Sequence, residues 1–270
     1  MCKVFAVINQ KGGVGKTTTT FNMGAEIANK GNKVLLMDMD PQGSLTTSMG
    51  FIAYDIENTI GKVFEYIIRS ERASNIRRGE TGVNINDYIL TRDNLDLIPS
   101  NLTLSVADIS IVTATAREYI LKKIIMQLKD SYDYIIIDCP PTLGMLVVNV
   151  LTAADSIIVP IKASEMDAKG FETLLDTVEL IRMQTNPNLQ IDGVLMTMFD
   201  NRLKEAREVL ESLYNFCSQY GIRIYNSKIG TSTKASRAFR ERKTLAEFDK
   251  GSSLATGYSD FVLEVLENGK

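Results

Sequence analysis

The sequence contains no histidine, and it has only three cysteines among its 270 residues. The absence of histidine excludes histidine general bases, Ser-His and Cys-His nucleophile systems, and histidine metal ligands. Cys2, Cys139 and Cys217 are widely spaced and form no CxxC pair. This spacing argues against a disulfide framework, a zinc site or a redox dithiol, and it fits a reducing cytosol. Any catalysis must therefore use carboxylates, lysines, hydroxyls, backbone amides and a hard metal.

Long apolar runs and a strong net charge are also missing. No apolar run approaches the length of about 18 residues that suggests a membrane span, and the one that opens the chain is too short for a signal peptide. The net charge is −3, so binding to nucleic acid or to a membrane surface would have to come from a local patch. With 44% hydrophobic and 23% charged residues, the composition indicates a globular cytoplasmic protein.

Apolar segments alternate with amphipathic ones along the chain. We expect strands at residues 3–9, 33–38, 95–99, 132–138, 156–161 and 193–199. We expect helices at residues 16–30, 114–130, 142–153, 165–184 and 202–220. Several strand candidates are continuous Val, Ile and Leu runs, as in strands that are buried on both faces. The alternation predicts an α/β fold, with a mostly parallel twisted sheet and helices on both of its faces.

The whole chain, residues 1–270, is expected to form a single domain. Residues 51–93 interrupt the alternation, so we interpret them as an insertion at the sheet edge, with a helix-like piece at 58–69. Two or three short helices are expected in the last forty residues, within a basic C-terminal region around 228–266.

A glycine-rich segment, KGGVGKTT at residues 11–18, lies between the first expected strand and the first expected helix. Glycines allow successive backbone N–H groups to point at one anion, and the helix that follows adds its N-terminal dipole. Lys16 would bind the β- and γ-phosphates, and Thr17 would offer a hydroxyl to Mg²⁺. The predicted nucleotide-binding residues here are Lys11, Gly12, Gly13, Val14, Gly15, Lys16, Thr17 and Thr18.

This segment departs from the usual G-x-x-x-x-G-K-[ST] pattern, because Gln10 stands where the first glycine is expected. It resembles the deviant Walker A motif of the ParA/MinD superfamily of P-loop ATPases. The resemblance implies that Lys16 holds the phosphates of its own subunit, while Lys11 reaches the nucleotide of a partner in a homodimer. A second cation that arrives only when two subunits meet would couple ATP binding to dimerisation.

Carboxylates follow two of the other expected strands. The segment MDMDPQGS at residues 37–44 resembles the switch I motif of this superfamily, which implies that Asp40 positions the attacking water and that Asp38 lies near the metal. In YIIIDCPP, at residues 134–141, Asp138 matches the Walker B aspartate that holds Mg²⁺. The predicted catalytic residues are Lys11, Lys16, Asp40 and Asp138, and the predicted metal site consists of Thr17, Asp38 and Asp138.

The resemblance to ParA/Soj sequences extends through residues 94–105, 154–170 and 193–202. It implies that Glu165 touches the partner's nucleotide and that adenine contacts come from residues 229–232, including Gly230 and Ser232. Here the chain reads IGTSTKAS where Soj-like members more often read IPRNVRLS, so Thr231 replaces an arginine that binds DNA in those members.

Residues 228–243 contain six basic side chains and a single acidic one, Glu241. Such a patch can bind the phosphate backbone of DNA without reading its sequence. The resemblance adds Arg202, which stands at a DNA-contacting arginine of Soj-like members. The predicted DNA-binding residues are Arg202, Lys234, Arg237, Arg240, Arg242 and Lys243.

The favoured function is an ATP-dependent DNA partition ATPase that uses Mg²⁺. ATP would drive formation of a sandwich homodimer that binds nonspecific DNA at the nucleoid, and a centromere-binding ParB-like partner would stimulate the hydrolysis that releases it. A MinD-type membrane ATPase is disfavoured, because the C-terminal segment carries Asp260, Glu264 and Glu267 against Lys270 alone. An iron-protein-type reductase would need two cysteines placed for a cluster. An ATP switch that carries another cargo remains an open alternative.

Overall fold

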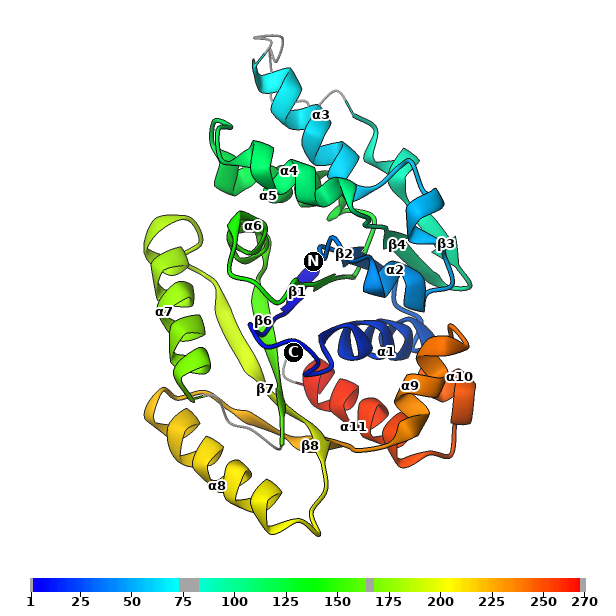
Figure 1. The fold of residues 1–270 in the computed structure, drawn as a ribbon, viewed down its shortest axis with the longest axis vertical. Helices are drawn as coiled ribbons and strands as arrows, with labels where there is room; N and C mark the ends of the chain where they lie inside the picture. The colour runs from blue at the N-terminus through cyan, green and yellow to red at the C-terminus, as the bar shows by residue number, and fades with distance from the viewer. Residues whose placement is uncertain (1, 73–82, 164–167, 268–270) are drawn as a thin grey trace.

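A computed structural model describes residues 2–72, 83–163 and 168–267, and within them eight strands form one sheet in the order β3-β4-β2-β5-β1-β6-β7-β8 (Figure 1). Every neighbouring pair is parallel except β3 and β4 at one edge. The strands are β1 (Lys3–Val7), β2 (Val34–Asp38), β3 (Leu90–Arg92), β4 (Leu95–Ile98), β5 (Tyr134–Asp138), β6 (Ser156–Lys162), β7 (Gln190–Phe199) and β8 (Ile224–Gly230).

All six strands expected from the sequence are present, and two more occupy the sheet edges. At one edge, β3 has only three residues, and at the other β8 reads IYNSKIG, with polar side chains where a central strand would be apolar. An edge strand has one neighbour and is less buried, so its sequence need not be a continuous apolar run. The hydrophobic pattern therefore predicts the centre of the sheet and misses its edges.

Helices cover both faces of this sheet, as expected (Figure 1). They are α1 (Lys16–Asn29), α2 (Ser44–Ser48), α3 (Ile60–Arg72), α4 (Thr103–Ile111), α5 (Ile120–Leu128), α6 (Met145–Ala153), α7 (Ala168–Gln184), α8 (Lys204–Gln219), α9 (Thr233–Arg240), α10 (Leu245–Asp249) and α11 (Ser253–Glu267). Successive strand residues point to opposite faces, so Leu35 and Met37 pack with helices α3 to α8, whereas Val34 and Leu36 pack with α1, α10 and α11.

Three helical segments differ from expectation, and one of them is the short helix α2, where no helix was expected. The helix expected at 114–130 is shorter, because Ala116 adopts a left-handed φ of 46° and a 3-10 turn (Arg117–Tyr119) precedes α5. The pattern also missed α4, which is preceded by the exposed Leu102 and carries exposed Val106 and Ile109, so that its apolar residues do not gather on one face.

Residues 51–93 contain α3 and the edge strand β3. The apolar face of α3, including Val63, Phe64 and Ile67, belongs to the same buried cluster as β1, β2 and β5. This segment therefore contributes to the hydrophobic core as well as to the sheet edge.

Candidate functional site

The candidate site lies where three parallel strands end side by side. In the sheet register, Val7 of β1 lies beside Asp138 of β5, and Asp38 of β2 lies on the other side of Asp138. Because parallel strands present their carboxyl ends at one edge, the glycine loop that follows β1 meets both aspartates there. The register thus brings together three motifs that are far apart in the sequence.

The glycine loop between β1 and α1 has the backbone shape of an anion cradle. Gly13 and Gly15 adopt left-handed φ values of 72° and 88°, and Gly15 is the N-cap of α1 without a side-chain cap. Two side chains outside the loop hold it in place: Asn9 Oδ1 accepts from Lys11 N at 2.9 Å, and Thr197 Oγ1 of β7 donates to the Val14 carbonyl at 2.9 Å. The loop and the helix N-terminus together fit a phosphate group.

Lys16 opens α1, and its side chain is buried among these groups. Its Nζ donates to the Lys11 carbonyl at 3.0 Å, which leaves two of its three N–H donors for an anion. Burial lowers the pKa of Lys16, and the nearby Asp138 opposes that shift. A buried ammonium at the start of a helix suits a polyanionic ligand, whose charge would replace the lost hydration.

Thr17 and Asp138 form the part of the site that suits a hard cation. Thr17 Oγ1 donates to Asp138 Oδ2 at 2.6 Å, and Asp138 is almost fully buried. Burial, followed by repulsion from Asp38, raises the pKa of Asp138 well above its usual range. A hydroxyl and a carboxylate are oxygen ligands of the kind that Mg²⁺ prefers, and a divalent cation would offset the crowded negative charge. The residues present therefore fit Mg²⁺.

Asp38 is fully buried, and its oxygens hold the segment that follows it. Thr46 donates to Asp38 Oδ2 from its backbone N and from its Oγ1, each at 2.8 Å, and Asp40 N donates to Oδ1 at 3.2 Å. Burial raises the pKa of Asp38 to about 6, although these hydrogen bonds oppose the shift. Of the predicted metal residues, Asp38 is thus engaged in anchoring α2, whereas Thr17 and Asp138 face each other beside the glycine loop.

Asp40 stands in the loop between β2 and α2 and is only partly buried. Its Oδ1 accepts from Gln42 N at 2.9 Å, which is the bond of an Asx turn. The turn leaves Asp40 at the surface of the same strand ends that carry Asp38 and Asp138.

Two of the residues predicted to contact the adenine base lie at the end of β8 and at the start of α9. Gly230 ends β8, and Ser232 is the N-cap of α9, where its side chain accepts from Lys234 N at 3.2 Å. Glu165 lies outside the described residues. The predicted roles of Gly230, Ser232 and Glu165 stay predictions.

Five of the six predicted DNA-binding residues are on α9 or in the turn that follows it, and most of the six already have partners. Lys234 pairs with Asp249 at 2.5 Å and Lys243 with Glu241 at 3.1 Å. The Arg237 guanidinium lies 5.3 Å from the centre of the Phe248 ring, and Arg240 is exposed. These pairs reduce the positive charge that the sequence alone suggests.

Arg202, the sixth predicted DNA-binding residue, lies in the turn between β7 and α8. Its guanidinium donates to both carboxylate oxygens of Asp200, at 2.9 and 2.7 Å. Because Phe199 pairs with Gly230 in the sheet, the turn of Arg202 and the start of α9 leave the sheet at the same edge.

The back of α1 is bonded to the C-terminal helices. Thr19 Oγ1 lies 3.1 Å from the Tyr258 hydroxyl of α11, and Asn22 Oδ1 accepts from Leu245 N at the start of α10 at 2.7 Å. The phosphate-facing helix is therefore in direct contact with α10 and α11, the two helices that follow the basic patch. The sequence reasoning missed Asn22, Thr46, Thr197 and Tyr258, although the first three are polar residues inside otherwise buried segments, a signal that could have found them.

The chain is similar to a known domain family, to several curated proteins and to solved structures. The AAA domain family matches residues 2–191. The chain is 37% identical over 269 residues to the sporulation initiation inhibitor protein Soj of Bacillus subtilis, covering 100% of both. It is 33% identical to the chromosome-partitioning ATPase Soj of Treponema pallidum, covering 98% of both. Cobyrinic acid a,c-diamide synthase from Mycobacterium smegmatis with bound ADP and magnesium superimposes with a TM-score of 0.80 at 30% identity, over 100% of this chain and 97% of that one.

Proposed function

The chain belongs to the AAA domain family and to its ParA/Soj-type partition ATPases, and from that premise we propose that its ATP-bound form is a homodimer that binds DNA without sequence specificity. It is an ATPase, and its cofactors are ATP and Mg²⁺. The observation that carries the proposal is the loop of residues 11–18, which has a lysine at each end of its glycines and opens a helix bonded to the C-terminal helices.

Three residues of this chain would hold the nucleotide and its metal. Lys16, at the start of α1, would donate to the phosphates, while Thr17 and Asp138 would position Mg²⁺. The bound Mg²⁺ supplies charge neutralisation at the phosphates during phosphoryl transfer. Asp38 would act indirectly, because its oxygens are occupied by Thr46 and Asp40.

Two further residues are assigned to the hydrolysis step. Lys11 would place its cation on the phosphates of the partner subunit's nucleotide, so that hydrolysis requires the dimer. Asp40, which is partly exposed at the strand ends, would orient the attacking water. The role of Lys11 would explain why the glycine loop has one lysine more than a phosphate site needs.

The DNA contact would lie on α9 and the turn after it, with Arg237 and Arg240 as its main cations. This DNA binding would place the protein at the nucleoid, and a ParB-like partner would stimulate the hydrolysis that ends it. A membrane cargo has less support, because the apolar residues Phe261, Val262 and Val265 of α11 are buried in the core. No helix in the described part of the chain has the length and apolarity to cross a membrane.

Mobility shift on a random-sequence DNA duplex tests this function, with Mg²⁺ and ATP, with Mg²⁺ and ADP, and without nucleotide, at one fixed salt concentration. We expect a shift with ATP alone, and we expect Lys16→Ala to abolish it. Equal binding in all three states, or no binding in any, would contradict the proposal and favour an ATP switch for another cargo.

A further inference from the structure

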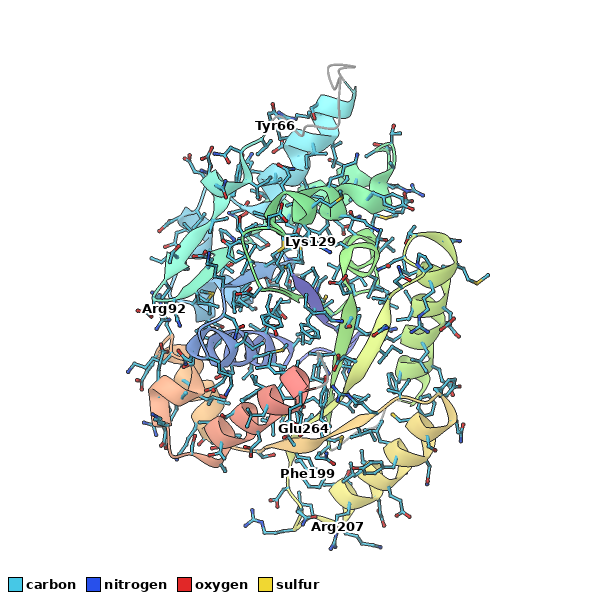
Figure 2. All side chains as sticks on the ribbon, turned by 180° about the vertical axis from the view of Figure 1, so that it is seen from behind. Tyr66, Arg92, Lys129, Phe199, Arg207 and Glu264 are labelled. Carbon is cyan, nitrogen blue, oxygen red and sulfur yellow. The ribbon has the colours of Figure 1, made fainter. Side chains whose placement is uncertain are left out.

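Arg242 is held in an unusual conformation in the turn between α9 and α10. Its φ is 56°, in the left-handed region that an arginine rarely adopts. Its backbone N donates to the Phe239 carbonyl at 3.0 Å, and its own carbonyl accepts from Arg92 Nη1 of β3. Arg92 also donates from Nη2 to Glu247 of α10 at 3.4 Å, and Figure 2 shows Arg92 beside these helices. The turn follows β8 at one edge of the sheet in the chain, but it is fixed by Arg92 of β3 at the other edge.

The side chain of Arg242 binds the end of a third element. Its Nη1 donates to the Gly50 carbonyl at 3.1 Å. Gly50 follows α2 with a left-handed φ of 94°, and its N donates to the Thr47 carbonyl at 3.0 Å, so it is the terminal glycine of that helix. A Cβ added at Gly50 would lie 4.0 Å from Arg242 Cβ and 3.7 Å from Arg92 Nη1. Arg242 and Arg92 thus pack directly on the C-terminal end of α2.

The other end of α2 is bonded to the nucleotide site. Thr46 of α2 donates twice to Asp38, and Asp38 lies beside Asp138 in the sheet register. Helix α2 has only five residues, so the two sets of bonds are about one helical turn apart. A short, rigid element therefore connects the carboxylate pair to the turn that carries Arg242.

We propose that Arg242 is a positioning residue and not a DNA contact: it fastens the segment Thr233–Asp249 to α2, so that changes at Asp38 and Asp138 on nucleotide binding reach the basic patch. The DNA side of this inference rests on the proposed function. A phosphate contact by Arg242 would compete with its bond to the Gly50 carbonyl and with the packing around Arg92. Arg240 and Arg242 are both exposed, and what distinguishes them is that Arg242 is bonded to the end of α2 whereas Arg240 has no such bond.

The salt dependence of DNA binding separates the two roles. The DNA-binding constant K falls as salt rises, and each lost phosphate contact makes the plot of log K against log salt concentration less steep by about one unit. Loss of a positioning residue leaves that steepness unchanged. We expect Arg242→Ala to keep the wild-type slope and to reduce the ratio of DNA affinity with ATP to that with ADP about fivefold or more. The matched control Arg240→Ala should make the salt dependence less steep and keep the ratio of DNA affinity with ATP to that with ADP. A less steep salt dependence in Arg242→Ala, with an unchanged ratio of DNA affinity with ATP to that with ADP, would overturn the proposal.

Hydrogen exchange provides a readout that does not involve DNA. In the wild type, amides of Thr233–Asp249 should exchange differently with a non-hydrolysable ATP analogue and with ADP, both with Mg²⁺. Arg242→Ala should abolish this difference there and retain it in residues 38–48. Arg92→Ala removes the bonds from β3 to the same turn and should give the same result. This second variant keeps the test available if Arg242→Ala does not fold.

A nucleotide-dependent difference in Thr233–Asp249 that survives these substitutions, or that is absent from the wild type, would overturn the role of Arg242. A wild-type protein that binds no DNA would end the proposed function, and the exchange experiment would still decide the inference.

Discussion

At the scale of single residues, the site is defined by charges that are buried close together. Asp38 and Asp138 end neighbouring strands, both are almost completely buried, and burial raises the pKa of each of them. Lys16 is the buried cation beside them, and its burial disfavours its own charge. Such a set is costly in isolation, and it is compensated when a polyanion and a divalent cation bind together. The electrostatics therefore favour joint binding of nucleotide and Mg²⁺.

The two lysines of the glycine loop should separate binding from hydrolysis. Lys16→Ala should abolish nucleotide binding, because it removes the buried cation at the start of α1. Lys11→Ala should keep ATP affinity within about threefold and lower the hydrolysis rate about a hundredfold, the usual effect of losing one transition-state charge contact. Fluorescent-nucleotide titration and single-turnover hydrolysis measure the two effects. Hydrolysis at the wild-type rate in Lys11→Ala would remove Lys11 from the mechanism.

At the scale of elements, the sequence predicts the strands and helices that are strongly periodic and misses those defined by contacts. The motif-bearing parts, β1, α1, β2 and β5, follow from apolar runs and from glycines next to charged residues. By contrast, α2 has five residues and is held by bonds at its ends to Asp38 and Arg242, neither of which is in the helix. The spatial relation of α2 to the C-terminal turn depends on a contact across 192 residues of sequence, which no local pattern contains.

The contact between α3 and α4 provides a test of packing at this scale. A Cβ added at Gly61 of α3 would lie 2.6 Å from Leu104 N and 2.9 Å from Leu104 Cα, so the backbone of α4 would have to move. We expect Gly61→Ala to reduce the free energy of unfolding by about 1–3 kcal/mol, although alanine is the better helix former. Urea unfolding measures this change.

Gly144→Ala is the matched control for Gly61→Ala. The nearest atom to an added Cβ at Gly144 is Asp108 Oδ2 at 3.8 Å, an ordinary contact. Gly144 is the N-cap of α6, where alanine is less favourable than glycine, so the control should lose less than about 1 kcal/mol, through the cap and not through a close contact. Equal stability of the two variants would show that α4 yields to the added methyl group at little cost.

At the scale of the whole molecule, the last helix closes the core behind the first. Phe261 of α11 is fully buried and meets the Tyr225 ring edge-on, with centroids 4.7 Å apart. Glu264 of the same helix accepts from Asn226 N at 2.8 Å, and it lies beside β8 in Figure 2. The C-terminal helix thus joins α1 to the outer strand and forms part of the core.

Two substitutions on α11 test how much this closure contributes. Phe261→Ala should cost about 3–5 kcal/mol of unfolding free energy, because it empties a buried aromatic site. Leu263→Ala, on the exposed side of the same helix, should change stability by less than about 1 kcal/mol. Chemical denaturation of both variants gives the comparison. A small loss in Phe261→Ala would mean that α11 is only loosely docked.

The first helix of this chain packs on a helix that lies far along the sequence. Thr19 and Tyr258 are 239 positions apart, and the apolar side of α1, with Phe21, Met23 and Ile27, packs in the cluster that includes α11. A nascent chain on the ribosome must therefore leave that side of α1 without its partner until α11 has been synthesised. A chain that terminates before α11 would lack the support behind the phosphate loop, so such a copy should be unable to enter the ATP cycle.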